Sequence, residues 1–244
     1  MSAPGETVAR ARRADVTFVA AAVAYYWLGS LVPLLVLGFV VAQLAFGDVL
    51  ADWSLAHLDA ALSPTGRSVL RRALLDSSGA TALGAVGAAG LVWGWSRLYR
   101  TLAAAFERVY ETTHSDGVVA RAFAGAVVVP AISVGMALAV SGLLTAYDGV
   151  LWEILHVLAV ALSLFPVFVT LPPTRPGLRS AIVGATVTAA AWIALRSLLE
   201  AYATLGWLAP TYDLLGTLVL FVAFLYFGTL ALLLAVALTA ALDD

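Results

Sequence analysis

The chain lacks cysteine, lysine and asparagine altogether, and it has few charged residues of either sign. Without cysteine, it can form neither a disulfide nor a site that uses a thiolate as metal ligand or nucleophile. Charged residues make up 11% of the 244 residues, against about 25% in soluble domains. Thirteen arginines and fifteen acids are too few to give a soluble domain of this length a polar surface. The formal net charge of −2 also gives no reason to expect nucleic acid as a partner.

Long hydrophobic stretches take the place of charge, because 62% of the residues are hydrophobic. Six windows contain no charged residue: 16–47, 77–96, 122–147, 154–174, 180–195 and 214–242. About 20 helical residues cross the hydrocarbon layer of a membrane, and five windows reach that length. The window 180–195 becomes long enough if its helix continues through Arg196 to Glu200 with both charged groups at the interface.

These windows predict an all-α fold, a polytopic membrane helix bundle with six transmembrane helices. The expected spans are about 16–46, 77–97, 122–147, 154–174, 178–200 and 214–242, and they form one domain, 16–244, after a cytoplasmic N-terminal segment 1–15. Residues 48–76 predict two short amphipathic interfacial helices at the outer surface. The apolar face formed by Leu98, Leu102, Ala105, Phe106 and Val109 fits either a helix along the inner leaflet or a continuation of the second span.

The arginines orient the bundle, since positive charge near span ends is retained on the cytoplasmic side. With the N-terminus inside, nine arginines lie on the inner side, three lie outside within residues 67–72, and Arg196 lies at the outer end of the fifth span. We therefore expect a multi-pass protein of the cell (inner) membrane with both termini in the cytoplasm. Arg12 and Arg13 could instead begin a twin-arginine export signal, but the uncharged run of 32 residues that follows is far longer than the hydrophobic part of a cleavable signal.

Arg196 is the first candidate functional residue, because ionisable groups within lipid are costly. It lies about 25 Å along a helix from Arg179, near the outer edge of the hydrocarbon and four residues before Glu200. One interpretation is a local ion pair between Arg196 and Glu200 that holds the helix end. The other is an outward-facing site for an anionic head group, with Arg196 as its cation.

Arg97 and Arg100 raise the same question at the inner side. They follow two tryptophans, a pattern that is typical of residues anchoring a helix at the membrane interface. In the middle of the spans the polar residues are mainly hydroxyl-bearing ones, which we expect to bond to backbone carbonyls. Small residues at helical spacing, such as Gly90 and Gly94, predict a seam where helices pack.

The sequence does not support a metal, cofactor or catalytic site. The three histidines are far apart, and none has the i, i+4 partner or the nearby carboxylates of a zinc ligand. There is no glycine-rich phosphate loop after a strand and no serine elbow. We therefore expect no cofactor and no enzyme activity.

Several segments, taken in order along the chain, resemble the YihY/BrkB family. Residues 24–33, which read AYYWLGSLVP, are similar to the signature of the family's first span. Residues 93–110 and Arg121 resemble the family's segment after the second span. The loop before the family's fifth span is similar to Leu171-Pro172 with Arg175, Arg179 and Gly184. The family's last-span motif is similar to Tyr202, residues 212–216 and Leu225-Tyr226. Together these segments cover nearly the whole chain.

The resemblance implies a six-helix inner-membrane protein. Members of the family were once labelled ribonuclease BN, and some are linked to serum resistance or to lipid traffic in the envelope. The chain departs from the family in its last span, where a Gly-small-Glu-apolar-Asn pattern is replaced by Ala235-Val236-Ala237-Leu238-Thr239, so that the glutamate is missing. We do not expect ribonuclease activity, because the chain has no soluble catalytic body, no metal-ligand cluster and no basic groove for a polyanion.

Two functions of different kinds fit these residues. The first is a transporter or flippase-like protein, with membrane lipids and an anionic amphiphile as its expected partners. The second is a non-catalytic membrane scaffold for envelope integrity, in which the same residues anchor the helices. For the first function, the residues expected to contact substrate or line a groove are Tyr25, Tyr26, Ser30, Pro33, Arg97, Arg100, Arg196, Glu200, Tyr202, Tyr212 and Tyr226. The sequence implies no oligomeric state.

Overall fold

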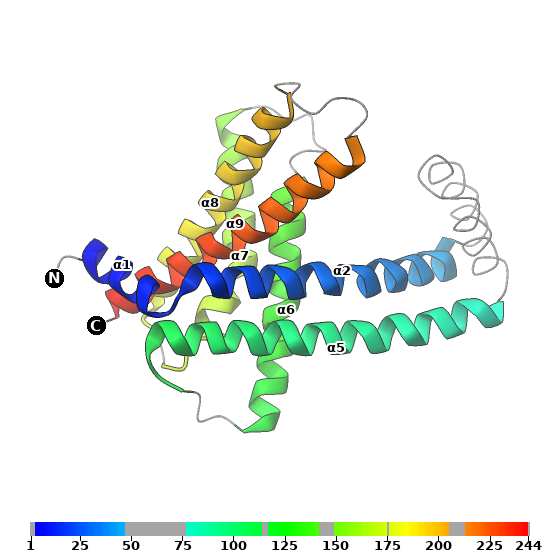
Figure 1. Cartoon of the computed structure of the whole chain (residues 1–244), viewed down its shortest axis with the longest axis horizontal. Helices are drawn as coiled ribbons and strands as arrows, with labels where there is room; N and C mark the ends of the chain where they lie inside the picture. Colours follow the sequence, from blue (N-terminus) through cyan, green and yellow to red (C-terminus); the bar gives the residue numbers. More distant parts are fainter. Residues whose placement is uncertain are drawn as a thin grey trace. The chain divides into compact units, whose positions relative to one another are not determined.

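The computed structural model describes residues 3–46, 77–113, 117–141, 149–174, 176–204 and 213–243. Within these residues the chain forms helices and no strand (Figure 1). The helices are α1 (Ala3–Arg13), α2 (Val16–Phe46), α5 (Ser77–Tyr110), α6 (Val118–Ser141), α7 (Val150–Thr170), α8 (Leu178–Thr204) and α9 (Asp213–Leu242). The all-α prediction is confirmed for this part of the chain.

The chain divides into two compact units. The larger unit contains Met1–Tyr26 and Ser96–Asp244, and the smaller unit contains Trp27–Trp95. Both boundaries fall inside helices, so that α2 and α5 each contribute one part to either unit.

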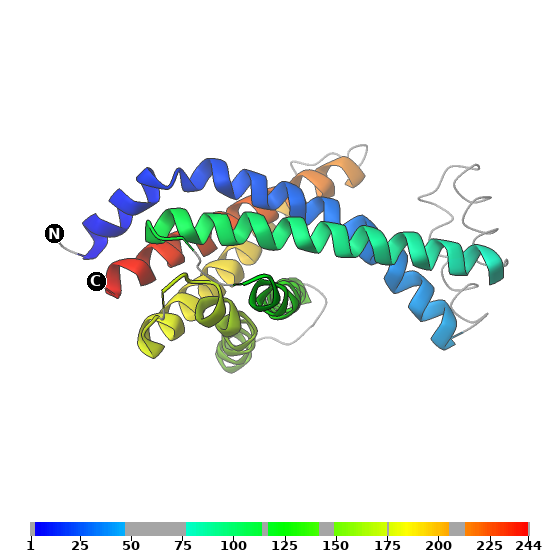
Figure 2. The ribbon, with the colours of Figure 1, turned by 90° about the horizontal axis from the view of Figure 1, so that it is seen from below.

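Four long helices form the body of the larger unit. The α7 helix packs against α6 and α8, and α8 also packs against α9. The α1 helix lies against α9, so that the two chain termini come to the same end of this unit (Figure 1, Figure 2).

Small residues allow the helices of the larger unit to approach closely. Gly184 of α8 has so little space that an added Cβ atom would lie 2.5 Å from the Phe168 ring of α7 and 2.6 Å from Cγ2 of Thr239 in α9. The Trp192 indole lies beside Gly228 and donates a hydrogen bond of 2.8 Å to its carbonyl. Close packing of this kind is a main source of helix association in lipid.

The N-terminal segment contains a helix that lies outside the six uncharged windows. The α1 helix occupies most of residues 1–15, and the chain bends by 62° between Gly5–Arg13 and Val16–Leu31. Asp15, at the bend, has a φ of 50°, in the left-handed region that aspartate tolerates better than most residues. Its N–H donates to the carbonyl of Arg12, and its own carbonyl accepts from the N–H of Val19, both at 3.1 Å. Hydrogen bonds therefore continue through the bend.

The α5 helix decides between the two interpretations of residues 98–109. One helix runs from Ser77 to Tyr110, so these residues continue the second predicted span, and a separate helix along the inner leaflet is wrong. The predicted apolar face is confirmed, because all five of its residues are buried. The Phe106 ring centroid on this face lies 6.4 Å from that of Phe168. After Tyr110 the helix ends with Glu111 at a φ of 54° and a hydrogen bond from the N–H of Thr112 to the carbonyl of Glu107, as in a Schellman motif.

In the smaller unit, α2 and α5 pack through the predicted glycine seam. An added Cβ atom would lie 3.0 Å from Cβ of Pro33 at Gly90, and 3.1 Å from Cβ of Ser30 at Gly94. The seam is therefore confirmed as a helix contact within the chain. Pro33 lies inside α2 and does not end it.

Four helices in the described residues are long and apolar enough to cross a membrane: Ala122–Ala139, Val150–Thr170, Leu178–Tyr202 and Val219–Leu242. The bent pair of α1 and α2 adds a fifth if it is one span. The six-span count therefore stays a prediction, and the two amphipathic helices expected within residues 48–76 lie outside the described residues. The helix of the fourth predicted span, α7, begins at Val150, so Glu153 lies inside it and not before it.

Candidate functional site

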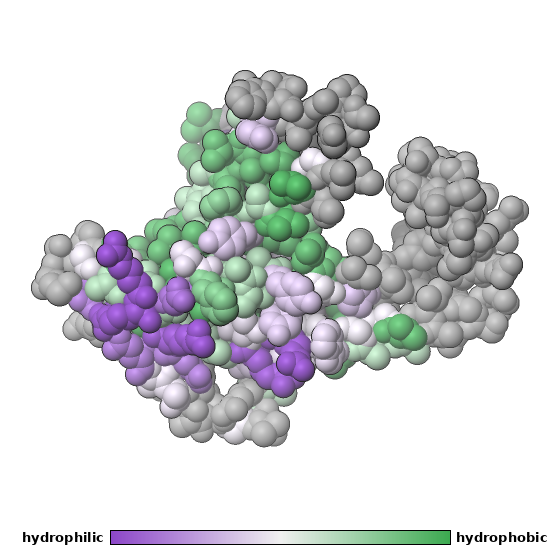
Figure 3. All heavy atoms as spheres, in the orientation of Figure 1, coloured by the Kyte–Doolittle hydropathy of each residue, from purple (hydrophilic) through white to green (hydrophobic). Residues whose placement is uncertain are grey.

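The larger unit has one end that is rich in polar side chains. Hydrophilic residues gather over α1, whereas hydrophobic residues surround α8 and α9 (Figure 3). Arg13, the last residue of α1, forms an ion pair with Glu111 just after α5 and another, at 3.0 Å, with Glu6. Glu6 also pairs with Arg10 at 3.4 Å. These ion pairs connect the N-terminal helix to the end of α5.

A hydroxyl cluster lies at the same end. The Tyr110 hydroxyl is 3.3 Å from Oγ1 of Thr239, the residue that stands where the family resemblance implies asparagine. The Asp243 carboxylate accepts a hydrogen bond from the Ser180 hydroxyl, which joins the end of α9 to the start of α8. Burial raises the pKa of the Tyr110 phenol, while the Thr239 hydrogen bond and Arg10 oppose this effect and Asp243 adds to it, each to a smaller extent.

A buried arginine lies toward the opposite end of α8. Arg196 is 7% exposed, and its Nη2 donates a hydrogen bond of 3.1 Å to Oε1 of Glu153 in α7. The predicted local pair with Glu200 is wrong, because Arg196 pairs with Glu153 and Glu200 is exposed. The Glu153 side chain is half-exposed, so the pair has one buried and one accessible partner.

The Arg196 guanidinium is only partly satisfied. Its Nε is buried, and no hydrogen-bond partner is described for it. A buried donor without a partner costs about 1–3 kcal/mol. Nε–H and one Nη2–H of an arginine point in parallel along the same edge of the group, the edge that binds two oxygens of a carboxylate or phosphate. In Arg196, Glu153 accepts a hydrogen bond from Nη2, and Nε is left for a second acceptor.

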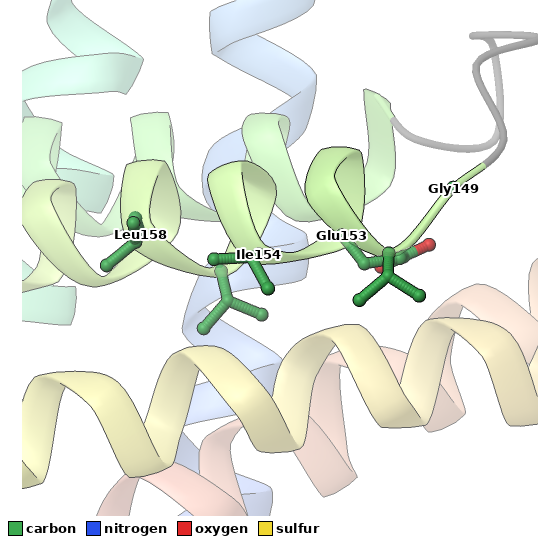
Figure 4. A pocket seen from close by; sticks show the side chains of 6 residues that line it. Gly149, Glu153, Ile154 and Leu158 are labelled. Carbon is green, nitrogen blue, oxygen red and sulfur yellow. The ribbon is translucent and has the colours of Figure 1, made fainter.

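An apolar groove of about 570 Å³ has Glu153, the ion-pair partner of Arg196, in its lining. It is lined by Gly149, Val150, Glu153, Ile154, Val157 and Leu158, all at the start of α7. Figure 4 shows the labelled side chains on the side of α7 that faces α8. Glu153 is the one charged residue in this lining, and Val150, Ile154 and Leu158 are at least half-exposed. In a membrane, such an open apolar surface would contact lipid chains.

Two more polar contacts lie near the groove. His156 is buried, with its Nε2 in hydrogen-bond contact with the carbonyl of Leu138 at the end of α6. The Trp152 ring packs against it edge-on, with ring centroids 6.1 Å apart. Among the described residues no group of three histidines or acids is placed to hold a metal ion.

The contacts described for the other predicted groove residues do not involve this ion pair. Tyr25 is exposed and contacts Tyr26 edge-on, and Tyr226 contacts its neighbour Phe227 in the same way. The Ser30 hydroxyl donates to the carbonyl of Trp27. The predicted role of such hydroxyls is thus confirmed here, as it is at Ser133, Thr188 and Thr229, which also bond to carbonyls of their own helices.

Arg97, Arg100 and two further tyrosines complete the set of predicted groove residues. Arg100 is exposed and donates to the Ser96 carbonyl at 3.0 Å and to its hydroxyl at 3.2 Å, while Arg97 is also exposed. Tyr202 is exposed near the end of α8, and Tyr212 lies outside the described residues. Sequence reasoning missed Glu153, because it was treated as the border of a span. The available signal was an acid at the same predicted membrane side as Arg196.

Comparison with known families decides the family of the chain. The family model described as "Virulence factor BrkB" matches residues 7–244. The chain belongs to the BrkB family. This match confirms the resemblance noted in the sequence, and it makes the apolar helices those of a BrkB family membrane protein. Neither the curated proteins nor the solved structures include a match to the chain.

Proposed function

We propose that this BrkB-family protein is a flippase-like transporter that binds an amphiphile at the groove beside α7 through an anionic group in the head of that molecule. The observation that carries the proposal is the buried guanidinium of Arg196, whose Nε has no described partner and whose Nη2 donates to Glu153 in the lining of an apolar groove. Arginine binds carboxylates and phosphates through two parallel hydrogen bonds. The groove offers the other half of an amphiphile, its hydrocarbon chain, a surface of Ile154, Val157 and Leu158.

The position of the site suits a molecule that stays in the membrane. A transported amphiphile needs a polar contact for its head group, while its chain remains in the surrounding lipid. Arg196 is placed about 25 Å along α8 from Arg179, close to one edge of a hydrocarbon layer. We further propose that this edge faces outward and that the end holding both termini is cytoplasmic, because the larger number of arginines lies at that end.

A membrane scaffold is the second candidate function, and one observation favours it. The Arg196–Glu153 pair joins α7 to α8, and a buried ion pair can serve packing specificity without any ligand. In that case, removing Arg196 would lower the stability of the helix bundle, and the protein would have no transport activity with or without Arg196.

Lipid translocation in proteoliposomes tests the proposal. Acyl-chain-labelled phospholipids are reconstituted with the purified protein, and the fraction of label accessible to a membrane-impermeant quencher is followed over time. We expect wild-type protein to accelerate translocation over empty vesicles and Arg196→Gln to abolish the acceleration. Arg179→Gln, which removes an exposed arginine from the other end of the same helix, is the matched control and should retain it.

The scaffold function gives a different result. Wild-type protein would then leave the translocation rate of every tested phospholipid at the value of empty vesicles. Circular dichroism of Arg196→Gln shows whether a loss of activity reflects unfolding. A folded Arg196→Gln protein that translocates lipid as fast as wild type would also overturn the proposal.

A further inference from the structure

The two charges of the ion pair differ in their access to the groove. Arg196 is buried and is not among the lining residues, whereas the Glu153 side chain is half-exposed and belongs to the groove lining. For a ligand anion to take both Nε and Nη2 of Arg196, Glu153 has to release Nη2 and turn into the groove. The displaced carboxylate would then need a positive partner of its own, because an unpaired charge beside an apolar surface is costly.

We propose that the ligand of this site is a zwitterionic phospholipid with a primary ammonium group, a phosphoethanolamine type of head group. This inference rests on the proposed binding of an amphiphile at Arg196, but not on its transport. The phosphate places two oxygens on Nε and Nη2 of Arg196, which satisfies the donor that Glu153 leaves free. The ammonium donates to the Glu153 carboxylate, so that each charge of the native pair receives one charge of the ligand.

Charge balance favours this ligand over a purely anionic lipid. The native pair is neutral, and a zwitterion keeps it neutral, whereas an anionic head group would add one unpaired negative charge in a medium of low dielectric constant. A quaternary ammonium fits less well, since it cannot donate hydrogen bonds to a carboxylate. The described lining also contains no aromatic ring of the kind that binds choline groups.

Binding of three lipids with the same acyl chains tests the inference. Phosphatidylethanolamine, phosphatidylglycerol and phosphatidylcholine are titrated onto the purified, detergent-solubilised full chain, and bound lipid is quantified by native mass spectrometry. We expect wild-type protein to prefer phosphatidylethanolamine. Glu153→Gln should weaken the binding of phosphatidylethanolamine by about tenfold, which is the effect of losing one charge-assisted hydrogen bond. The same variant should bind phosphatidylglycerol as tightly as wild type or more tightly. Retained phosphatidylglycerol binding also shows that this variant is folded.

Two further variants separate the possible failures. Arg196→Gln should weaken the binding of all three lipids. In the double variant, adding Glu153→Gln to Arg196→Gln should not weaken the binding of phosphatidylethanolamine further. If Glu153→Gln leaves the binding of phosphatidylethanolamine intact, or weakens phosphatidylglycerol equally, the assignment of the ammonium to Glu153 is wrong. In that event, transport that still depends on Arg196 would leave the proposed function standing. If Arg196→Gln does not affect lipid binding, both the proposed function and the proposed ligand are wrong.

Discussion

At the scale of single residues, Gly184 has no space for one more carbon atom. The atoms closest to a Cβ added at Gly184 belong to Phe168 and Thr239, and each of these residues is 1% exposed. Neither side chain can move into open space, and Thr239 is also held by its hydrogen bond with Tyr110. Three helices therefore meet at a position where only glycine fits.

Gly184→Ala should destabilise the protein by about 1–3 kcal/mol, the usual cost of overpacking a tight core. Unfolding of the purified protein by a denaturing detergent, followed by circular dichroism, measures the effect. Gly29→Ala is the matched control, because no atom lies within 4 Å of a Cβ added there. Alanine should leave stability at that helical position unchanged or raise it by up to about 1 kcal/mol. Equal stability of the two variants would contradict the packing at Gly184.

At the scale of helices, the junction between the end of α5 and the end of α9 depends on a neutral tyrosine. Tyr110 lies next to Thr239, with the Asp243 carboxylate nearby. Both burial and that carboxylate disfavour a phenolate, and so they raise the pKa of Tyr110 in the folded protein above its ordinary value of 10.0. Deprotonation would place a negative charge where these two helices meet.

The sign of the resulting pH dependence follows from this raised pKa. Above about pH 10 the unfolded chain releases the Tyr110 proton while the folded protein still holds it, so the free energy of unfolding falls as pH rises through the folded pKa. Tyr110→Phe should reduce this alkaline loss, at the cost of about 1 kcal/mol at neutral pH for the lost hydrogen bond. Unfolding measured from pH 7 to pH 11 checks this, with Tyr202→Phe, at an exposed position, expected to keep the wild-type slope.

At the scale of the whole molecule, contacts within the larger unit bring the end of one helix next to the start of a neighbouring helix. The start of α7 lies by the end of α6 through His156, and the late part of α8 lies by the start of α7 through Arg196. At the other end, Ser180 near the start of α8 bonds to Asp243 after α9. Such an up-and-down order is what short connections between membrane-spanning helices produce.

The absence of cysteine makes the orientation directly testable. Single cysteines can be introduced without background labelling, at Thr113 between α5 and α6 and at Asp148 between α6 and α7. With both termini in the cytoplasm, a membrane-impermeant maleimide should label Asp148→Cys in intact cells and Thr113→Cys only after the membrane is permeabilised. The reverse pattern would show that the site at Arg196 faces the cytoplasm.

Properties of local sequence were predictable. Six uncharged windows, the apolar face of residues 98–109 and the glycine seam at Gly90 and Gly94 each follow from residue type and spacing, and the family from the order of its motifs. The extent of α5 was left open, because an amphipathic continuation of a span and an interfacial helix have the same periodicity. The helix in residues 3–13 was missed, since its short apolar side becomes meaningful only against α9.

The sequence alone thus determined that this chain is a BrkB-family bundle of membrane helices, because composition and hydrophobic length are properties of each segment by itself. Only the tertiary structure decided which acid meets Arg196. Glu200, one helical turn away, is the partner in one of the two sequence interpretations, yet Glu153, 43 residues earlier in the chain, forms the ion pair. The reason is physical: helix packing turns one side of α8 toward α7, and no local pattern states which sides of two helices will face each other.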